Sequence, residues 1–410
     1  MLQYILWGVS FITLWLVIIW LNFLYSSDHQ KKQKRLPKIT LTVPVFNEEK
    51  TILKTLISLV DADYPKQLTE ILVVNDGSTD NTASIVKKFQ KNHSQVILIN
   101  QKNAGKAAAM NAALDVAKGE LFAVIDADSR IEPDALQKMI LRFSNKQVGA
   151  VISRIKVEQP KNLLERMQRF EYIMSTMTRF IMKNFGTLAI THGALSLFKT
   201  SVVKKLGGFA RDKNNLTEDF EIALRLRYNG YLVEMEPTAI SHTCVPPDLH
   251  MFWRQRMRWS RGYIYNMWNY RKMIFSKKHG VFGTFQLPVN VAAIVILVAN
   301  VGIILYDFTT RFFDFFVRSL TLDDYFLNTL LDLPTVKEFV LARNIQVTIP
   351  ILLSLALGIY LIIFAHRVYD EKLKSHLVPL LAYTFFIPYF STANWLCSIV
   401  QEVRKAKRRW

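Results

Sequence analysis

Long uncharged apolar runs near both ends of the 410-residue chain restrict its fold more than any other feature. Each run has about the 20 residues that an α-helix needs to cross the hydrocarbon core of a bilayer. Half of all residues are hydrophobic, yet the middle of the chain is rich in charge, which predicts one globular domain flanked by membrane helices. The runs are Tyr4–Leu24, Leu287–Tyr306, Ile345–Ala365 and Leu377–Val400.

Basic residues next to these runs indicate the orientation of the chain. The net charge is +19, and Lys/Arg clusters lie at residues 31–35 and 405–409. Because such clusters favour the cytosolic side, the first run is predicted to be an uncleaved anchor followed by cytosol. We expect four spans, although four would leave the basic tail outside; the alternative is that the last run does not cross. Basic residues at membrane ends, rather than on one aromatic-interleaved face, argue against nucleic acid as a partner.

Residues 37–242 alternate strand-like and helix-like segments. This alternation predicts an α/β domain of the Rossmann-like kind, with a mostly parallel sheet and helices on both faces. Ligands of open α/β sheets bind at the carboxyl ends of strands, where this chain places polar residues. The predicted strands are Ile39–Val45, Glu70–Val74, Val96–Ile99 and Leu121–Ile125, and the predicted helices are Glu48–Val60, Asn81–Gln90 and Lys106–Lys118.

Asp76 follows the second predicted strand and precedes a Gly-Ser pair. A carboxylate there can accept hydrogen bonds from a uracil N–H or from ribose hydroxyls, but such an acid is also typical of an Asx-turn or a helix N-cap. Pro44, Asn47 and Glu48 stand at the end of the preceding strand. Polar residues at both strand ends favour one shared pocket.

Asp126 and Asp128 stand two residues apart at the end of the fourth predicted strand. Paired carboxylates suit Mg²⁺ or Mn²⁺, which would bridge the oxygens of a diphosphate. The alternative is a turn that caps the helix beginning near Glu132. Lys106 opens an earlier helix, where its ammonium either pairs with phosphates or is solvated.

Asp219 is the next acid in this order and opens a helical segment, with Glu218 before it. General base catalysis requires a positioned carboxylate beside the acceptor hydroxyl. The same residues also form an ordinary helix start, so only their place in the series favours catalysis.

Gln255, Arg258 and Trp259 share one face of a predicted helix through i,i+3 and i,i+4 spacing. Arginine can hold diphosphate oxygens, and tryptophan can stack on a sugar ring. The alternative is a helix at the membrane surface, where Trp and Arg are common.

Residues 163–185 have apolar side chains at helical spacing. This segment is either a core helix or a helix at the membrane interface, and we favour the interface.

Taken in order, these motifs resemble those of the processive membrane glycosyltransferases of family 2. That family includes poly-β-1,6-N-acetylglucosamine, hyaluronan, chitin and cellulose synthases, and the resemblance is greatest to the first of these. It covers nearly the whole chain. The motifs are PVFNEE from Pro44, VVNDGSTDNT from Val73, NAGKAAAMNAAL from Asn103, DADS from Asp126, LTEDFEIALRLRYNGY from Leu216 and FWRQRMRWSRG from Phe252.

The resemblance implies a GT-A domain on amphipathic interface helices, with transmembrane helices forming a polymer channel in the plasma membrane. The implied reaction inverts the anomeric carbon: a sugar passes from a UDP-sugar, expected to be UDP-N-acetylglucosamine, to the end of a growing β-linked polysaccharide that is extruded. The implied regions are an N-terminal anchor (1–30), a cytosolic GT-A catalytic domain (37–245), interface helices carrying the QRMRW motif (246–280) and a C-terminal transmembrane region (281–410).

The resemblance also implies roles for individual residues. Asp219 would be the catalytic base, and Asp128 would bind a divalent cation, Mg²⁺ or Mn²⁺. The implied partners are the UDP-sugar, the polysaccharide acceptor, the lipid bilayer and a small membrane accessory subunit. Nucleotide-sugar binding is assigned to Pro44, Asn47, Glu48, Asp76, Lys106 and Asp126, and contact with the diphosphate and acceptor to Glu218, Gln255, Arg258 and Trp259.

Two segments depart from the family pattern. Residues 151–155 lack the Gly-Asn-Pro-Arg-Ile of the poly-N-acetylglucosamine synthases, and Thr191–Ala194 stands where a Ser-Gly-rich segment is expected. These changes leave the sugar and the acceptor open. The alternatives are a non-processive transferase acting on a lipid-linked acceptor, a hyaluronan- or cellulose-type synthase, and a scaffold subunit with an inactive domain, which the intact acids oppose.

Overall fold

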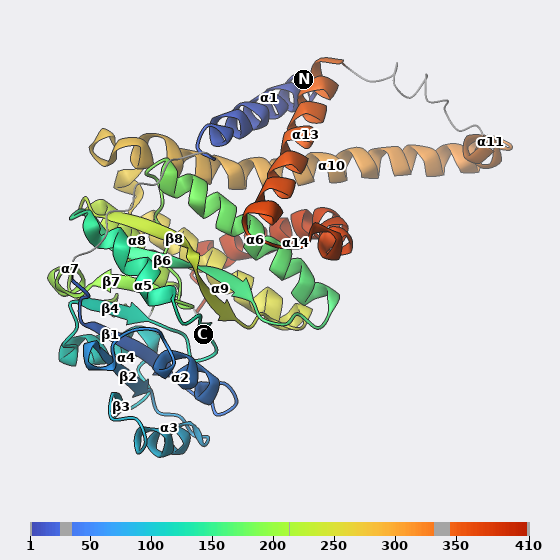
Figure 1. The fold of residues 1–410 in the computed structure, drawn as a ribbon. Helices are drawn as coiled ribbons and strands as arrows, with labels where there is room; N and C mark the ends of the chain where they lie inside the picture. The colour runs from blue at the N-terminus through green and yellow to red at the C-terminus, as the bar shows by residue number, and fades with distance from the viewer. Residues whose placement is uncertain (1, 25–34, 213, 332–344, 408–410) are drawn as a thin grey trace.

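An eight-stranded sheet forms the centre of the computed structural model, which describes residues 2–24, 35–212, 214–331 and 345–407 (Figure 1). The strand order is β3-β2-β1-β4-β7-β6-β8-β5. Strands β1 to β4 are parallel, as are β6 and β8, whereas β7 is antiparallel to both of its neighbours and β5 to β8. The predicted α/β class is confirmed, with a mixed sheet. The strands are β1 Ile39–Val45, β2 Thr69–Asn75, β3 Val96–Asn100, β4 Leu121–Val124, β5 Arg130–Ile131, β6 Val148–Val157, β7 Ser196–Lys199 and β8 Leu232–Thr243.

Helices cover both faces of the sheet, and each face has its own apolar core. In β2, Ile71 and Val73 face one core while Leu72 and Val74 face the other, as the two-residue period of a strand requires. The first core is completed by α2 (Ile52–Val60), α3 (Thr82–Gln90) and α5 (Ala135–Ile140), and the second by α4 (Lys106–Val116), α7 (Thr200–Lys205) and α8 (Glu218–Tyr228).

Two long helices, α6 (Leu163–Asn184) and α9 (Leu249–Asn269), lie between the sheet domain and the apolar helices (Figure 1). α6 begins at a capping box in which Asn162 Oδ1 accepts a hydrogen bond from Glu165 N–H at 2.9 Å. One side of α6 contacts β6 and β8, and another contacts the C-terminal apolar helices. This is the position expected of interface helices; their contact with lipid stays a prediction.

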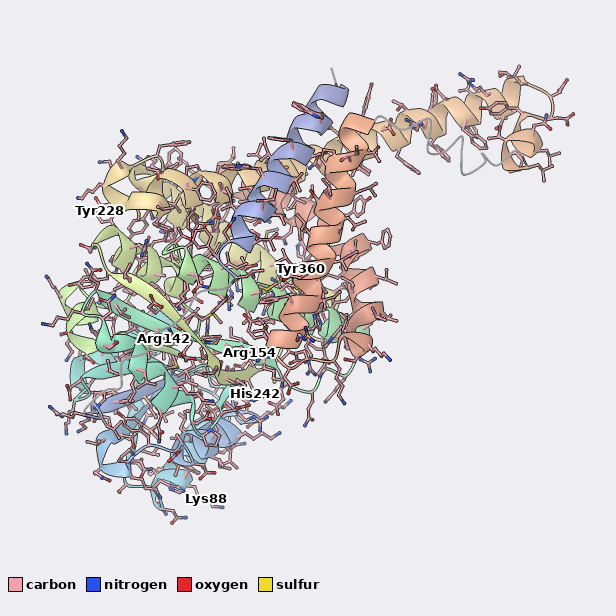
Figure 2. All side chains as sticks on the ribbon, turned by 45° about the horizontal axis from the view of Figure 1, so that its top comes forward. Lys88, Arg142, Arg154, Tyr228, His242 and Tyr360 are labelled. Carbon is pink, nitrogen blue, oxygen red and sulfur yellow. The ribbon has the colours of Figure 1, made fainter. Side chains whose placement is uncertain are left out.

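The four predicted apolar runs all form helices. Among the described residues, Phe282–Thr321 and Thr348–Val368 are long and apolar enough to cross a membrane, and few of their residues are buried. Helices α1 and α13 lie side by side, and α10 extends past them to the short α11 (Figures 1 and 2). The helices are α1 Leu2–Leu21, α10 Leu287–Thr321, α11 Tyr325–Leu331, α13 Ile345–Val368 and α14 Leu377–Val403.

Both ends of α14 contact the sheet domain and its helices. In the loop before α14, Glu371 pairs with Arg154 of β6 at 3.4 Å and with Arg169 of α6 at 2.6 Å. Figure 2 shows Arg154 at the edge of the sheet domain, close to the lower end of α13. At the other end of α14, Glu402 accepts a hydrogen bond from Arg261 of α9 at 2.6 Å. These contacts fix both ends of α14 against α6, β6 and α9.

Candidate active site

Lys106 is the centre of what we call the ion-pair cluster: Asp126 and Glu218, which pair with Lys106, and Asp219, whose charge acts on it. Lys106 begins α4, and its Nζ lies 2.5 Å from Asp126 Oδ1, after β4, and 3.3 Å from Glu218 Oε1, at the start of α8. Burial would lower the pKa of Lys106, but the three carboxylates outweigh burial and raise it. Lys106 is therefore a permanent cation that can also pair with phosphate oxygens.

Asp128 adds another acid beside Asp126. Burial, followed by the charges of Asp126 and Glu48, raises the pKa of Asp128 to about 6. A divalent cation would relieve this repulsion between carboxylates. No three Asp, Glu, His or Cys side chains in the described part of the chain are grouped to hold a metal ion by themselves. Mg²⁺ commonly binds one or two carboxylates together with substrate phosphates, and Asp126 and Asp128 could serve in this way.

Asp219 lies where the ion-pair cluster meets a cavity. Burial, followed by the charge of Glu218, raises the pKa of Asp219 to about 6, while Lys106 and Arg258 act in the opposite direction. The Phe220 N–H donates to Asp219 Oδ1 at 2.8 Å and helps to fix the carboxylate. A carboxylate that titrates near neutral pH is suited to general base catalysis.

The QRMRW motif lies on α9, as predicted. Trp259 lines the cavity, and Arg258 is close enough to Asp219 to lower its pKa. Gln255 Oε1 is buried and has no hydrogen-bond partner among the described residues. Buried acceptors are normally satisfied, so a ligand or water is expected at this atom.

Arg256 and Glu171 belong to the same site, but the sequence analysis missed them. The Arg256 guanidinium donates to both Glu171 oxygens at 2.8 Å and lies over the Trp259 ring, 4.4 Å from its centroid. This bidentate pair joins α9 to α6 and restrains the indole through a cation–π contact. The two residues are 85 positions apart, so no local pattern could pair them.

A cavity of about 490 Å³ opens beside Asp219. Helices α6, α8, α9, α10 and α14 contribute to its walls, so it leads towards the apolar helices. Of the ion-pair cluster only Asp219 lines it, which places Asp219 at the boundary between the two. The volume is typical of a small-molecule site. Its lining contains both aromatic rings and amide or hydroxyl groups, among them Trp259, Tyr263, Asn290, Phe390, Asn394 and Trp395.

The Asp76 carboxylate is buried under the loop that precedes α4. It accepts hydrogen bonds from Gln101 Nε2 at 2.6 Å and from the N–H groups of Ala104 and Gly105 at 2.9 and 2.8 Å. Asp76 thereby fixes the position from which Lys106 starts its helix. A direct contact with uridine stays a prediction.

The ends of β1 and β2 form one edge, as expected. The Asn47 N–H donates to Ser78 Oγ at 3.0 Å, and the Glu48 N–H donates to Thr82 Oγ1 at 2.8 Å. Pro44 lies at the end of β1, directly before this loop. These contacts bring the predicted nucleotide-binding positions together, while their ligand stays a prediction.

The segment Thr191–Ala194 packs directly against Asp126. The Asp126 N–H donates to the Gly193 carbonyl at 2.7 Å, and a Cβ on Gly193 would overlap the Asp126 carboxylate. Next to it, burial lowers the pKa of His192 to about 3, so the ring is neutral and contacts the Ser153 carbonyl at 3.0 Å. The segment that departs from the family pattern therefore shapes the site.

Comparison with known proteins identifies the family. The glycosyl transferase family 2 model matches residues 40–207. The probable glycosyltransferase YdaM of Bacillus subtilis is 30% identical over 296 residues, which are 67% of this chain and 69% of YdaM. The chain belongs to glycosyl transferase family 2. The poly-beta-1,6-N-acetyl-D-glucosamine synthase of Staphylococcus epidermidis is 33% identical over 244 residues, and the match spans 59% of this family 2 enzyme but only 57% of the synthase.

A solved structure shows that this family 2 enzyme has the predicted GT-A fold. The mannosyltransferase PcManGT from Pyrobaculum calidifontis, solved with GDP-Man and Mn²⁺, aligns with a TM-score of 0.57 at 22% sequence identity. The alignment covers 81% of this chain and 98% of PcManGT.

Proposed function

We propose that this enzyme transfers N-acetylglucosamine from UDP-N-acetylglucosamine to the end of a growing β-linked polysaccharide. The observation that carries the proposal is the position of Asp219, between a cluster suited to a diphosphate and an aromatic-lined cavity that reaches α10 and α14. The names of the staphylococcal relatives, which are poly-beta-1,6-N-acetyl-D-glucosamine synthases, support this sugar.

On the donor side, Lys106 and Arg258 would neutralise the charge of the departing UDP. Asp126 and Asp128 would hold a divalent cation, Mg²⁺ or Mn²⁺, which when bound stabilises the diphosphate as a Lewis acid. PcManGT, which shares the fold, was solved with Mn²⁺, and this supports a cation site. Asp76 would act by keeping the loop before Lys106 in place.

On the acceptor side, Asp219 would take the proton of the attacking hydroxyl. The acceptor oxygen then bonds to C1 of the donor sugar while the bond from C1 to the UDP oxygen breaks. This single displacement inverts C1, so an α-linked donor gives a β-linked product. Trp259, restrained by Arg256, would hold the terminal acceptor sugar against Asp219.

We further propose that the enzyme lies in the plasma membrane with its catalytic domain, residues 37–245, in the cytosol. Helices α1, α10 and α13 would span, and α14 would lie along α9 at the interface. Three spans place residues 31–35 and 405–409 on the cytosolic side, in agreement with the positive-inside bias. The lengthening product would leave through the cavity between α10 and α14.

Purified enzyme in lipid nanodiscs tests the reaction. UDP release and product size are measured with UDP-N-acetylglucosamine, with UDP-glucose, or with UDP-glucuronate plus UDP-N-acetylglucosamine, in Mg²⁺ or Mn²⁺. Asp219→Asn protein serves as the control for contaminating activity. We expect a high-mass product from UDP-N-acetylglucosamine alone.

Other outcomes separate the alternatives. UDP release that yields only short or lipid-bound product would favour the non-processive transferase. A polymer that needs both donors would indicate a hyaluronan-type synthase, and a polymer from UDP-glucose alone would indicate a cellulose-type synthase. No UDP release under any condition would overturn the proposal.

A further inference from the structure

Arg179 places a positive charge in the cavity without a carboxylate partner of its own. It lies on α6, on the face that also carries Tyr172 and Ser175 into the cavity. Its guanidinium makes no hydrogen bond or ion pair with any residue that the structure describes. Arg256, in the same cavity, is instead bound through two hydrogen bonds to Glu171.

The surroundings of Arg179 do not complete its hydrogen bonding. Burial lowers the pKa of Arg179, and the charges of Tyr172, Asp219 and Glu171 act in the opposite direction. Arginine nonetheless stays charged at any physiological pH, with five N–H donors in a planar fork. Arg179 is partly buried, and its guanidinium faces the cavity. A ligand that enters the cavity would displace water from the guanidinium, so acceptor oxygens on the ligand would be needed to replace the lost hydrogen bonds.

The position of Arg179 assigns it to the acceptor. It shares the cavity with Asp219 and Trp259, whereas Lys106 and Asp128 do not line that cavity. The diphosphate of the donor would lie at those two residues, on the other side of Asp219. A ligand of Arg179 in this cavity would therefore lie on the acceptor side of Asp219.

We propose that Arg179 is a positioning residue that donates hydrogen bonds to the acetamido carbonyl of the acceptor's terminal sugar and selects acetylated over deacetylated ends. The inference rests on the proposed function, which gives the acceptor an N-acetylglucosamine terminus. A planar carbonyl oxygen matches the guanidinium fork better than a hydroxyl, which is itself a donor. A free amine lacks that oxygen and, once protonated, is repelled by the guanidinium.

Direct acceptor binding tests this inference without the donor. The ligands are β-1,6-linked glucosamine tetrasaccharides, either fully N-acetylated or with a free amine on the non-reducing terminal residue. Binding to full-length enzyme in nanodiscs is followed by tryptophan fluorescence, because Trp259 and Trp395 line the cavity. Wild type is expected to prefer the acetylated end roughly 10- to 100-fold, as for a hydrogen bond to a charged group.

Two variants of Arg179 and one matched control sharpen the test. Arg179→Met keeps an unbranched side chain without the charge and should lose most of the preference. Arg179→Lys keeps the charge without the fork, so it should still reject the amine but bind the acetylated end more weakly. Arg166→Met replaces an exposed arginine on the same helix, outside the cavity, and should behave as wild type.

Failure of the inference differs from failure of the proposed function. Equal binding of both tetrasaccharides by wild type, or an undiminished preference in Arg179→Met, would overturn the role of Arg179 even if polymer forms. A preference that disappears in Arg179→Met would support the role even if UDP-N-acetylglucosamine proves to be the wrong donor.

Discussion

Asp219 combines two properties that rarely occur together by chance: a carboxylate whose pKa is raised by burial, and direct access to a cavity. Asp219→Asn keeps the shape of the side chain but cannot accept a proton. We expect turnover to fall at least about 100-fold, the usual contribution of a general base. UDP affinity, measured by calorimetry, should be nearly unchanged. Asp115→Asn, an exposed position on α4, is the matched control, and near-normal turnover by Asp219→Asn would exclude the base role.

The activity should depend on pH through Asp219. A base must be ionised to act, and the pKa of Asp219 is raised to about 6, so the rate is lost as pH falls through that value and is constant above it. Saturating Mg²⁺ or Mn²⁺ keeps Asp128 ionised, so the acidic limb of kcat then reports on Asp219. A kcat that does not change between about pH 5 and pH 7 would contradict this assignment.

Gly193 leaves room for the Asp126 carboxylate. Gly193→Ala would put a Cβ where that carboxylate lies and would push it away from Lys106. The new Cβ would meet the Asp126 side chain and not the backbone, so the carboxylate can move aside while the fold persists. We expect turnover to fall by about 10-fold or more. Gly302→Ala, where nothing lies within 4 Å of the new Cβ, is the control. Turnover and thermal unfolding measured on both variants separate misplacement from misfolding.

The carboxylate of Glu371 pairs the loop between α13 and α14 with Arg154 and Lys156 of β6 and with Arg169 of α6. Burial alone would raise the pKa of Glu371, but the hydrogen bond and charge of Arg169, together with Lys156 and Arg154, lower it. Its contribution to stability is therefore present above the unfolded pKa of about 4.3 and is lost as pH falls below it.

Removal of that carboxylate should destabilise the protein. Glu371→Leu removes the carboxylate that pairs with Arg154 and Arg169, and leaves Arg154 only its hydrogen bond to the Tyr369 carbonyl. This should reduce the free energy of unfolding by about 3 kcal/mol. Glu120→Gln breaks an exposed pair with Arg35 and should change stability by no more than about 0.5 kcal/mol. Thermal unfolding of the two variants checks this, and equal shifts would mean that Glu371 has no special role.

The strands and helices that could be predicted from the sequence were recognised from local patterns of apolar and polar residues. The β2 run Ile71–Val74 is apolar on both faces, which is recognisable from sequence alone because a strand between two helical layers is buried on both sides. The antiparallel strand β7 was not predicted, because strand direction depends on how the long α6 connection returns to the sheet. Neither the cavity nor Arg179 could be predicted, since α6 meets α14 only in three dimensions.

For the candidate site as well, the sequence indicated some features of the structure and not others. The motifs that contain Lys106, Asp126 and Glu218 are distant in the sequence, and the structure brings these three side chains into contact. The sequence did not indicate that the Asp76 carboxylate accepts hydrogen bonds from backbone N–H groups. The conformation of the neighbouring loop decides which groups that carboxylate meets. The roles of these residues await the experiments above.

For the protein in its membrane, the proposed three spans predict which segments a membrane-impermeant thiol reagent can reach. With Cys244 and Cys397 replaced by serine, a cysteine introduced at Lys407 should be protected in intact cells. A cysteine at Thr321, at the far end of α10, should be labelled. Labelling at both positions would instead support the four-span arrangement and contradict the three-span one.

The anchoring of α14 at both ends has a consequence for the lipid environment. Helices that span must tilt or stretch the bilayer when its hydrophobic thickness changes, at a modest energetic cost. α14 is tied to α6 through its preceding loop and to α9 through Arg261. In the proposed three-span arrangement, the length of α14 is therefore matched to protein and not to lipid. Acyl-chain length should therefore alter the tilt of α10 and α13 while the distance between Trp259 and α14 stays constant. The enzyme would then tolerate membranes of different thickness at its acceptor site, and lipid composition would act mainly on the exit path.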